Sequence, residues 1–137
     1  MFYVHPGVLF DPDPPPPEIF IQTNGLVVEH HRIFLPKGLV TDDWLQRGGN
    51  RPALAGDPGT PDIYPVPYFD QHGGKTLEIF VDIWNVSKRA RKFRLQVLIR
   101  QADYVDDVLY DESGTIPADD GDRHRGFGVF VPIEMMT

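Results

Sequence analysis

Apolar and polar residues alternate with a period of two along residues 76–101. Every odd position from 77 to 83 and from 93 to 99 is Leu, Ile, Val or Phe, and charged or amide side chains take most of the even positions. This alternation predicts two β-strands, each with one face turned into a core. The basic segment 87–91 between them predicts a turn, so we expect an antiparallel hairpin with Val81 opposite Val97.

Further strands are predicted on both sides of this region. Residues 19–35 contain two apolar segments around Asn24-Gly25, a favoured two-residue turn, which predicts a second hairpin. Residues 126–135 repeat the odd apolar phase. Because proline has no N–H to donate, Pro132 restricts this last strand to a sheet edge or a bulge.

Two segments are rich in proline and glycine. Residues 1–18 form an extended N-terminal segment in which two short apolar stretches precede four consecutive prolines. These prolines hold the backbone in a polyproline II form, which suits a surface connector better than a docking segment. Residues 37–75 form a long loop, which we expect to be ordered because it carries large apolar side chains. Within it, Thr41–Gly48 begins with a helix-capping residue and ends with glycine, which predicts one or two helical turns.

The composition agrees with a small all-β protein. The chain has 137 residues, enough for one domain with a core, and its 13 glycines and 14 prolines disfavour long helices. We therefore predict a single-domain antiparallel β-sandwich over residues 1–137. Its architecture would be immunoglobulin-like or jelly-roll-like, with one long ordered loop and at most a short helical turn.

Charge and cysteine content exclude several function classes. The formal net charge of −7 argues against a nucleic-acid-binding protein, which is usually basic. Without cysteine, the chain has no disulfide, thiolate metal site or cysteine nucleophile. We recognise neither a membrane span nor a signal peptide, so the default compartment is the cytoplasm, with a larger particle or another export route left open. Asn85-Val86-Ser87 fits the N-glycosylation pattern, but without a secretion signal we expect no glycan there.

Charged residues are segregated by sign in the second half of the chain. Residues 88–100 contain six bases and no acid, and residues 101–122 contain eight acids and no base. Such a block of acids indicates either a cation site or a surface complementary to another subunit. Asp119, Asp120 and Asp122 have the oxygen ligands that calcium takes, but they lack the spacing of an EF-hand loop. A solvated acidic turn is therefore the favoured interpretation, and calcium is the alternative.

The sequence contains no recognisable catalytic set. The chain has two serines, which leave little material for a Ser-His-Asp arrangement. His30 and His31 are neighbours in a predicted strand, so their side chains point to opposite faces. A transition-metal site that combines one of them with His72 or His124 is a minor alternative, and so is a small metal-dependent enzyme. We expect no catalytic residue and no cofactor.

A group of apolar residues occupies even positions, on the face opposite the predicted core. Phe80, Trp84, Leu98 and Phe130 share this phase, beside Arg94. In one interpretation, the sheet is covered on both faces because the long loop lies over the even side. In the other, these residues form a contact surface for a protein or for a planar ligand such as a sugar ring.

We predict a non-catalytic structural or protein–protein interaction module, a subunit of a larger assembly whose partner is a second copy or another protein. Its interaction surface would combine the even-phase residues with the basic turn that contains Arg89 and Arg91. The acidic stretch begins near the opposite end of the predicted hairpin, which favours head-to-tail contacts. The alternative is a carbohydrate-binding module with structural calcium, whose stacking platforms would be Trp84, Phe80 and either Tyr64 or Tyr68.

Overall fold

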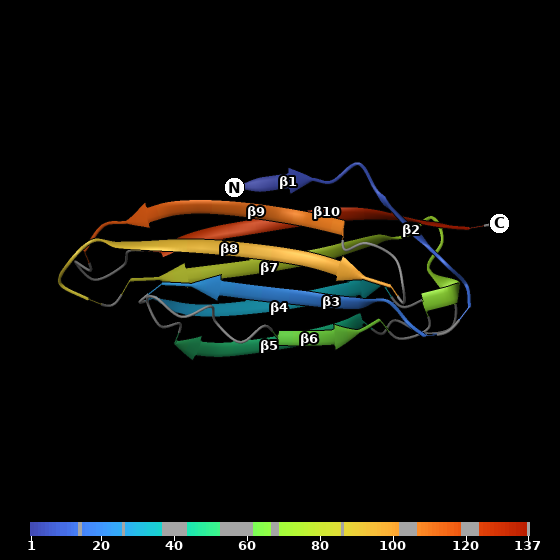
Figure 1. The fold of residues 1–137 in the computed structure, drawn as a ribbon, viewed down its shortest axis with the longest axis horizontal. Coiled ribbons are helices and arrows are strands. Elements are labelled where there is room, and N and C mark those ends of the chain that lie inside the picture. The colour runs from blue at the N-terminus through green and yellow to red at the C-terminus, as the bar shows by residue number, and fades with distance from the viewer. Residues whose placement is uncertain are drawn as a thin grey trace.

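In a computed structural model of the chain, two β-sheets pack face to face (Figure 1). The all-β sandwich predicted from the alternation is confirmed. In the described residues, no helix is long and apolar enough to cross a membrane. The structure describes residues 1–13, 15–25, 27–36, 44–52, 62–66, 69–85, 87–101, 107–118 and 124–136.

The larger sheet has six strands in the order β1-β10-β7-β4-β5, and β2 also pairs with β10. These strands are β1 (Phe2–Val4), β2 (Val8–Phe10), β4 (Val28–Pro36), β5 (Trp44–Pro52), β7 (Thr76–Trp84) and β10 (His124–Met135). The smaller sheet has four strands in the order β6-β3-β8-β9. They are β6 (Asp62–Pro65), β3 (Glu18–Asn24), β8 (Arg91–Arg100) and β9 (Asp107–Ile116), and Phe69–Gln71 forms a short 3₁₀-helix, η1.

The core lies between the two sheets and is built from the odd positions of the alternating segments. The odd positions of β7 from 77 to 83 and of β8 from 93 to 99 are buried, and so are those of β10 from 127 to 133. Full burial of a Val, Leu, Ile or Phe side chain contributes about 1.5–3 kcal/mol relative to exposure. These positions therefore hold the sheets together, and the even positions face outward.

The predicted hairpin over residues 76–101 is wrong, although both of its strands exist. β7 pairs with β10 and β4 in the larger sheet, whereas β8 pairs with β3 and β9 in the smaller one. Val81 therefore lies beside Phe127 and His31, not beside Val97. Alternation identifies the buried face of a strand, but two strands that face each other across a core show the same pattern as two neighbours in a sheet.

The predicted hairpin over residues 19–35 is wrong for the same reason. β3 belongs to the smaller sheet and β4 to the larger, so the chain changes sheets after Asn24-Gly25. Gly25 has a φ of 121°, and a Cβ atom there would collide with the carbonyl oxygen of Lys92. The Asn-Gly pair thus marks the point where the chain leaves the smaller sheet close against the backbone of β8, for which glycine is required.

Gly25→Ala is expected to lower the free energy of unfolding by about 2 kcal/mol or more. A side chain at this positive φ is strained by roughly 1–3 kcal/mol, and the added methyl group must also displace the backbone of β8. Urea unfolding followed by tryptophan fluorescence would measure the loss. Gly74→Ala is the control for backbone strain alone, because Gly74 has a φ of 78° with open space around its Cβ position. Equal losses in both variants would contradict a collision at Lys92.

The last predicted strand exists as β10, but it is an interior strand and not an edge. β10 pairs with β7 on one side, and on the other side it pairs in parallel with β1 and then with β2. β1 ends opposite Phe130 and β2 begins opposite Ile133, so Pro132 lies between the two pairings. The antiparallel architecture therefore has an exception in the N-terminal segment, whose two apolar stretches are short parallel strands.

The segment 37–75, predicted as one long loop, contains two strands and the helix η1 in its described residues. The helical turn predicted for Thr41–Gly48 is wrong from Trp44 onward, because those residues form β5, which pairs with β4 over its whole length. A ladder of backbone hydrogen bonds to an existing strand outweighs the weak local preference of a capping residue and a glycine for a helix.

Candidate functional site

A stripe of aromatic rings crosses the outer face of the larger sheet. Phe2 of β1, Phe130 of β10, Phe80 of β7 and Phe34 of β4 follow one another across four strands. Ring centroids are 6.0 Å apart for Phe2–Phe130, 5.9 Å for Phe130–Phe80 and 5.8 Å for Phe80–Phe34. We call these four residues the aromatic ladder.

The ladder follows from strand register and from one glycine. All four phenylalanines are at even positions, which face away from the core. Gly128 lies directly between Phe2 and Phe80 in the register, and a Cβ atom at this position would come within 2.6 Å of the Phe2 ring. The rings of the edge strand and of β7 therefore converge over a residue without a side chain. Phe2 is 75% exposed and Val4, which lies next to Phe130, is 67% exposed.

A cation lies against the ladder. The guanidinium carbon of Arg32 is 5.7 Å from the centroid of the Phe34 ring and 5.8 Å from that of Phe80. Arg32 pairs with Phe80 across β4 and β7, which fixes this position. An arginine over aromatic rings combines cation–π attraction with a large contact area, and both residue types are enriched at protein interfaces.

The structure divides the residues predicted for the interaction surface between the two outer faces. Phe80 and Phe130 are in contact in the ladder, and Trp84 lies at the end of the same strand as Phe80. Leu98 and Arg94 lie on the outer face of the smaller sheet, on the opposite side of the sandwich. The predicted continuous patch rested on the hairpin over 76–101, and it fails with that hairpin.

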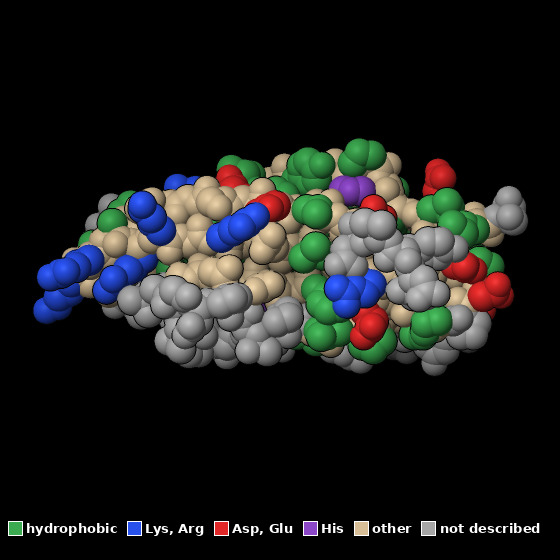
Figure 2. Space-filling view, in the orientation of Figure 1, with side chains coloured by type: hydrophobic (Ala, Val, Ile, Leu, Met, Phe, Trp, Pro, Cys, Tyr) green, Lys and Arg blue, Asp and Glu red, His purple; other side chains and the backbone are tan. Residues whose placement is uncertain are grey.

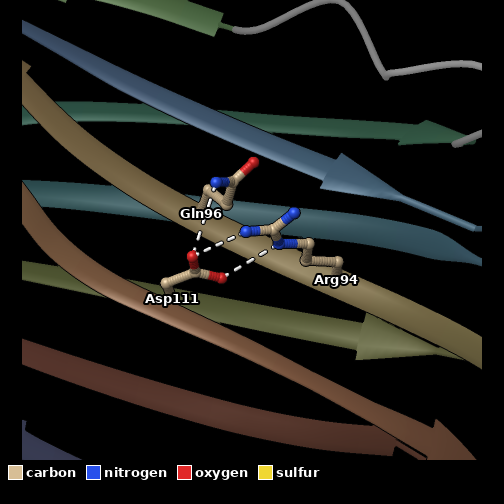
Figure 3. A network of polar contacts seen from close by, with 3 residues as sticks. All are labelled: Arg94, Gln96 and Asp111. Carbon is tan, nitrogen blue, oxygen red and sulfur yellow. Dashed lines mark hydrogen bonds and ion pairs between the residues drawn. The ribbon is translucent and has the colours of Figure 1, made fainter.

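On the smaller sheet, Arg94 takes part in a polar network (Figure 3). Its guanidinium donates hydrogen bonds to both carboxylate oxygens of Asp111, at 3.1 and 2.9 Å, and Gln96 donates to the same carboxylate at 3.5 Å. The hydrogen bond and charge of Arg94 hold the pKa of Asp111 below its ordinary value. This exposed pair stabilises the fold weakly, and its contribution is lost as the pH falls through the lowered pKa of Asp111.

The chain between β7 and β8 changes sheets, and we call its described residues, Asn85 and 87–90, the arch. Asn85 is 1% exposed. Its amide nitrogen donates to the carbonyl oxygens of Arg89 (2.7 Å), Ile116 (3.1 Å) and Pro117 (2.9 Å), and its oxygen accepts from the backbone N–H of Ser87. The asparagine of the glycosylation pattern is therefore a buried structural residue, and the folded chain does not expose it at the surface.

Charges of opposite sign gather at the two ends of the long axis. Lys88 and Arg89 are exposed on the arch, with Arg91 at its base. Figure 2 shows a group of Lys and Arg side chains at this end and several Asp and Glu side chains at the other. The described acids near the far end are Asp11, Asp13, Glu18, Asp70, Asp107 and Glu134, against Lys75 and Arg100.

The predicted calcium ligands lie outside the described residues. Asp119, Asp120 and Asp122 fall between the end of β9 and the start of β10, and a calcium site there stays a prediction. Among the residues with described positions, no three His, Asp or Glu side chains come together as metal ligands. Tyr68, one of the predicted stacking platforms, also lies outside the described residues, and Tyr64 faces the core.

Tyr64 belongs to a series of hydrogen-bonded polar side chains, with His31 and Glu29, that was not predicted from the sequence. Glu29 and His31 of β4 are both 0% exposed, with Glu29 Oε1 2.5 Å from His31 Nδ1, and Tyr64 Oη lies 2.7 Å from His31 Nε2. A hydroxyl, an imidazole and a carboxylate in series can orient a proton, as in a catalytic triad of a nucleophile, a base and a group that orients the base. Here the imidazole lies inside the sandwich, fully buried between Glu29 and Tyr64.

His30 and His31 do point to opposite faces, as predicted, but His31 is a core residue and not a surface one. The signal was available in the alternation, because Val27, Glu29, His31 and Ile33 share the buried odd phase.

Comparisons of the chain with protein-family models, with curated proteins and with solved structures return no match.

Proposed function

We propose that the protein is a non-catalytic interaction module, a subunit of a larger assembly, which binds a protein partner through the aromatic ladder and Arg32. The observation that carries this proposal is a row of four contacting phenylalanine rings on an outer sheet face, which ends in the strongly exposed Phe2. Aromatic anchors with an arginine are the residues that supply most of the binding energy at protein interfaces.

The geometry of the rings favours a protein over a carbohydrate as the ligand. Interplanar angles of 86° for Phe80–Phe130 and 69° for Phe34–Phe80 place neighbouring rings edge to face. Such a surface is ridged, and it suits interdigitating side chains, whereas a sugar ring stacks on a flat aromatic face. The predicted sugar platforms Phe80 and Tyr64 also lie in different sheets, and Tyr64 is bound to His31.

The partner can be captured with a photoreactive phenylalanine analogue at position 130 in cells that express the chain. Phe80→Ser is then expected to weaken binding to the identified, purified partner by about thirtyfold, which corresponds to about 2 kcal/mol for an anchor residue. Isothermal titration calorimetry would measure the dissociation constant.

Phe20 offers a matched control, because it is half-buried on the outer face of the smaller sheet with the guanidinium of Arg100 over its ring. The analogue at position 20 should not capture the same partner, and Phe20→Ser should leave the dissociation constant unchanged. Equal capture from both faces would contradict the proposal. Binding of a polysaccharide that Phe80→Ser abolishes would favour the carbohydrate alternative.

A further inference from the structure

The acidic end of the sandwich contains a hollow of about 250 Å³. Its lining is mainly apolar and includes one carboxylate, that of Asp107. The apolar lining residues are Val8, Leu9, Phe10, Pro17, Ile99 and Met136. Val8, Leu9 and Phe10 come from β2 in the larger sheet, and Ile99 and Asp107 come from β8 and β9 in the smaller one. The hollow is therefore an opening between the two sheets at the end of the core.

Hydrogen bonds hold the wall of this hollow in place. The side chain of Gln101 is almost buried and pairs with the backbone of Asp11 in both directions, at 3.1 Å to the N–H and 2.8 Å to the carbonyl oxygen. The backbone N–H of Met136 donates to the carbonyl oxygen of Phe10 at 2.8 Å. These contacts tie the chain after β2 to the end of β8, and the end of β10 to β2. The shape of the hollow is thus set by the fold.

The size and lining of the hollow indicate a single long cationic side chain. Pockets for drug-sized ligands are roughly 300–1,000 Å³, so this one is too small for most cofactors. Arginine and lysine have an aliphatic stem that packs on apolar surface and a charged head that seeks a carboxylate. Leu9, which is 50% exposed, and the half-buried Met136 offer the apolar surface, and Asp107, which is exposed at the rim, offers the carboxylate.

The arch presents side chains of this kind at the opposite end of the same molecule. Lys88, Arg89 and Ala90 are exposed at its tip, and neither cation forms an ion pair with another described residue. The backbone carbonyl of Arg89 accepts hydrogen bonds from Asn85 and Ser87, so the tip has a fixed conformation before any contact is made. A preorganised loop loses less entropy on binding than a flexible one.

We propose that copies of this chain associate head to tail, with Arg89 at the arch of one copy seated in the hollow of the next and paired with Asp107. This inference rests on the proposed role as an assembly subunit, but it uses a surface separate from the aromatic ladder. The two ends are separated by β8, whose ten residues span about 30 Å at roughly 3.3 Å per residue. Such a heterologous contact closes into a ring or continues as a filament.

Cysteine crosslinking tests the contact directly, because the chain has no cysteine of its own. Leu9, at the hollow, is 50% exposed, and Ala90, at the arch, is exposed. The double variant Leu9→Cys, Ala90→Cys should give disulfide-linked oligomers of increasing size on mild oxidation. A mixture of the two single variants should give mainly the mixed dimer. Random pairing, in which the mixed dimer is only as abundant as the two homodimers together, would overturn the proposal.

Charge reversal gives a second, independent measurement. Arg89→Glu and Asp107→Lys should each raise the dissociation constant about tenfold or more in sedimentation velocity at low salt, since each removes the same close charge pair. At a concentration where each variant alone is mainly monomeric, their equimolar mixture should form dimers, because one variant keeps its hollow and the other keeps its arch.

Lys75→Glu is the matched control, with the same change in net charge as Arg89→Glu at a residue outside the arch and the hollow, and it should associate normally. Phe80→Ser should also associate normally, so that failure of the ladder proposal and failure of this one are distinguishable. A wild-type chain that stays monomeric at every concentration, or an Arg89→Glu variant that associates like wild type, would overturn the head-to-tail contact.

Discussion

His31→Ala is expected to lower the free energy of unfolding by about 3–5 kcal/mol, the largest loss from any single substitution that we predict. His31 and Glu29 are both fully buried and in direct contact, and the loss of one member of a buried, charge-assisted hydrogen bond is strongly destabilising because the buried Glu29 carboxyl loses the imidazole. The Tyr64 hydroxyl loses its imidazole partner in the same step. Urea unfolding with linear extrapolation would measure the change.

A double variant separates the lost pairing from the lost packing. Glu29→Leu combined with His31→Leu replaces the pair by apolar side chains, and such replacements are often neutral or stabilising. The double variant should therefore be more stable than His31→Ala, although it also leaves the Tyr64 hydroxyl without His31. His30→Ala is the matched control on the opposite face of the same strand and should change stability by no more than about 0.5 kcal/mol. Equal losses of stability for His30→Ala and His31→Ala would contradict a stabilising role for the buried contacts among Glu29, His31 and Tyr64.

The sequence predicted which residues are buried better than it predicted which strands are neighbours. Burial of odd positions in β7, β8 and β10 followed from period-two alternation, because that period is the geometry of a strand with one apolar face. Strand pairing could not be read in the same way. The segments that change sheets, at Asn24-Gly25 and at the arch, are short and polar like hairpin turns, and their sequences carry no mark that distinguishes the two.

β9 escaped prediction because its alternation is interrupted. Its register with β8 shifts between Val97 and Leu98, which pair with Tyr110 and Val108. Leu109 is the extra residue of this bulge, and it is buried while its neighbour Tyr110 also packs against the core. Two consecutive inward residues, Leu109 and Tyr110, amid aspartates do not look like a strand in the sequence.

Burial raises the pKa of the Tyr110 phenol, and a hydrogen bond to Glu112 and the charge of Glu112 add to the shift.

The candidate site was predictable only in part. The outward position of Phe80 and Phe130 followed from their even phase, and their contact followed once β7 and β10 were neighbours. Phe2 and Phe34 could not be added to them, because nothing local shows that β1 and β4 flank this pair. The burial of His31 could be read from its odd phase, but its contact with Tyr64, 33 residues away in sequence, could not. The role of Asn85 was hidden for the same reason, because its acceptors Ile116 and Pro117 lie far away in sequence.

Asn85→Asp is expected to lower the free energy of unfolding by about 3 kcal/mol or more, although the two side chains have nearly the same shape. The substitution replaces a buried donor by an oxygen that faces the carbonyl oxygens of Arg89, Ile116 and Pro117. The Ile116 carbonyl loses a buried donor, which costs about 1–3 kcal/mol, and the buried carboxylate adds desolvation and repulsion. The arch would lose the side chain that joins it to the end of β9.

The loss in Asn85→Asp should grow with pH, which distinguishes a buried charge from a mere change of packing. In this environment the folded state favours the protonated carboxyl, so the folded variant binds its proton more tightly than the unfolded chain does, and stability falls as the pH rises. Unfolding free energies at mildly acidic and neutral pH, relative to wild type at each pH, would show the trend. Gln22→Glu, the same amide-to-carboxylate change on the outward face of β3, is the control and should stay within about 0.5 kcal/mol of wild type. If Asn85→Asp unfolds like that control, the hydrogen bonds of Asn85 do not hold the arch.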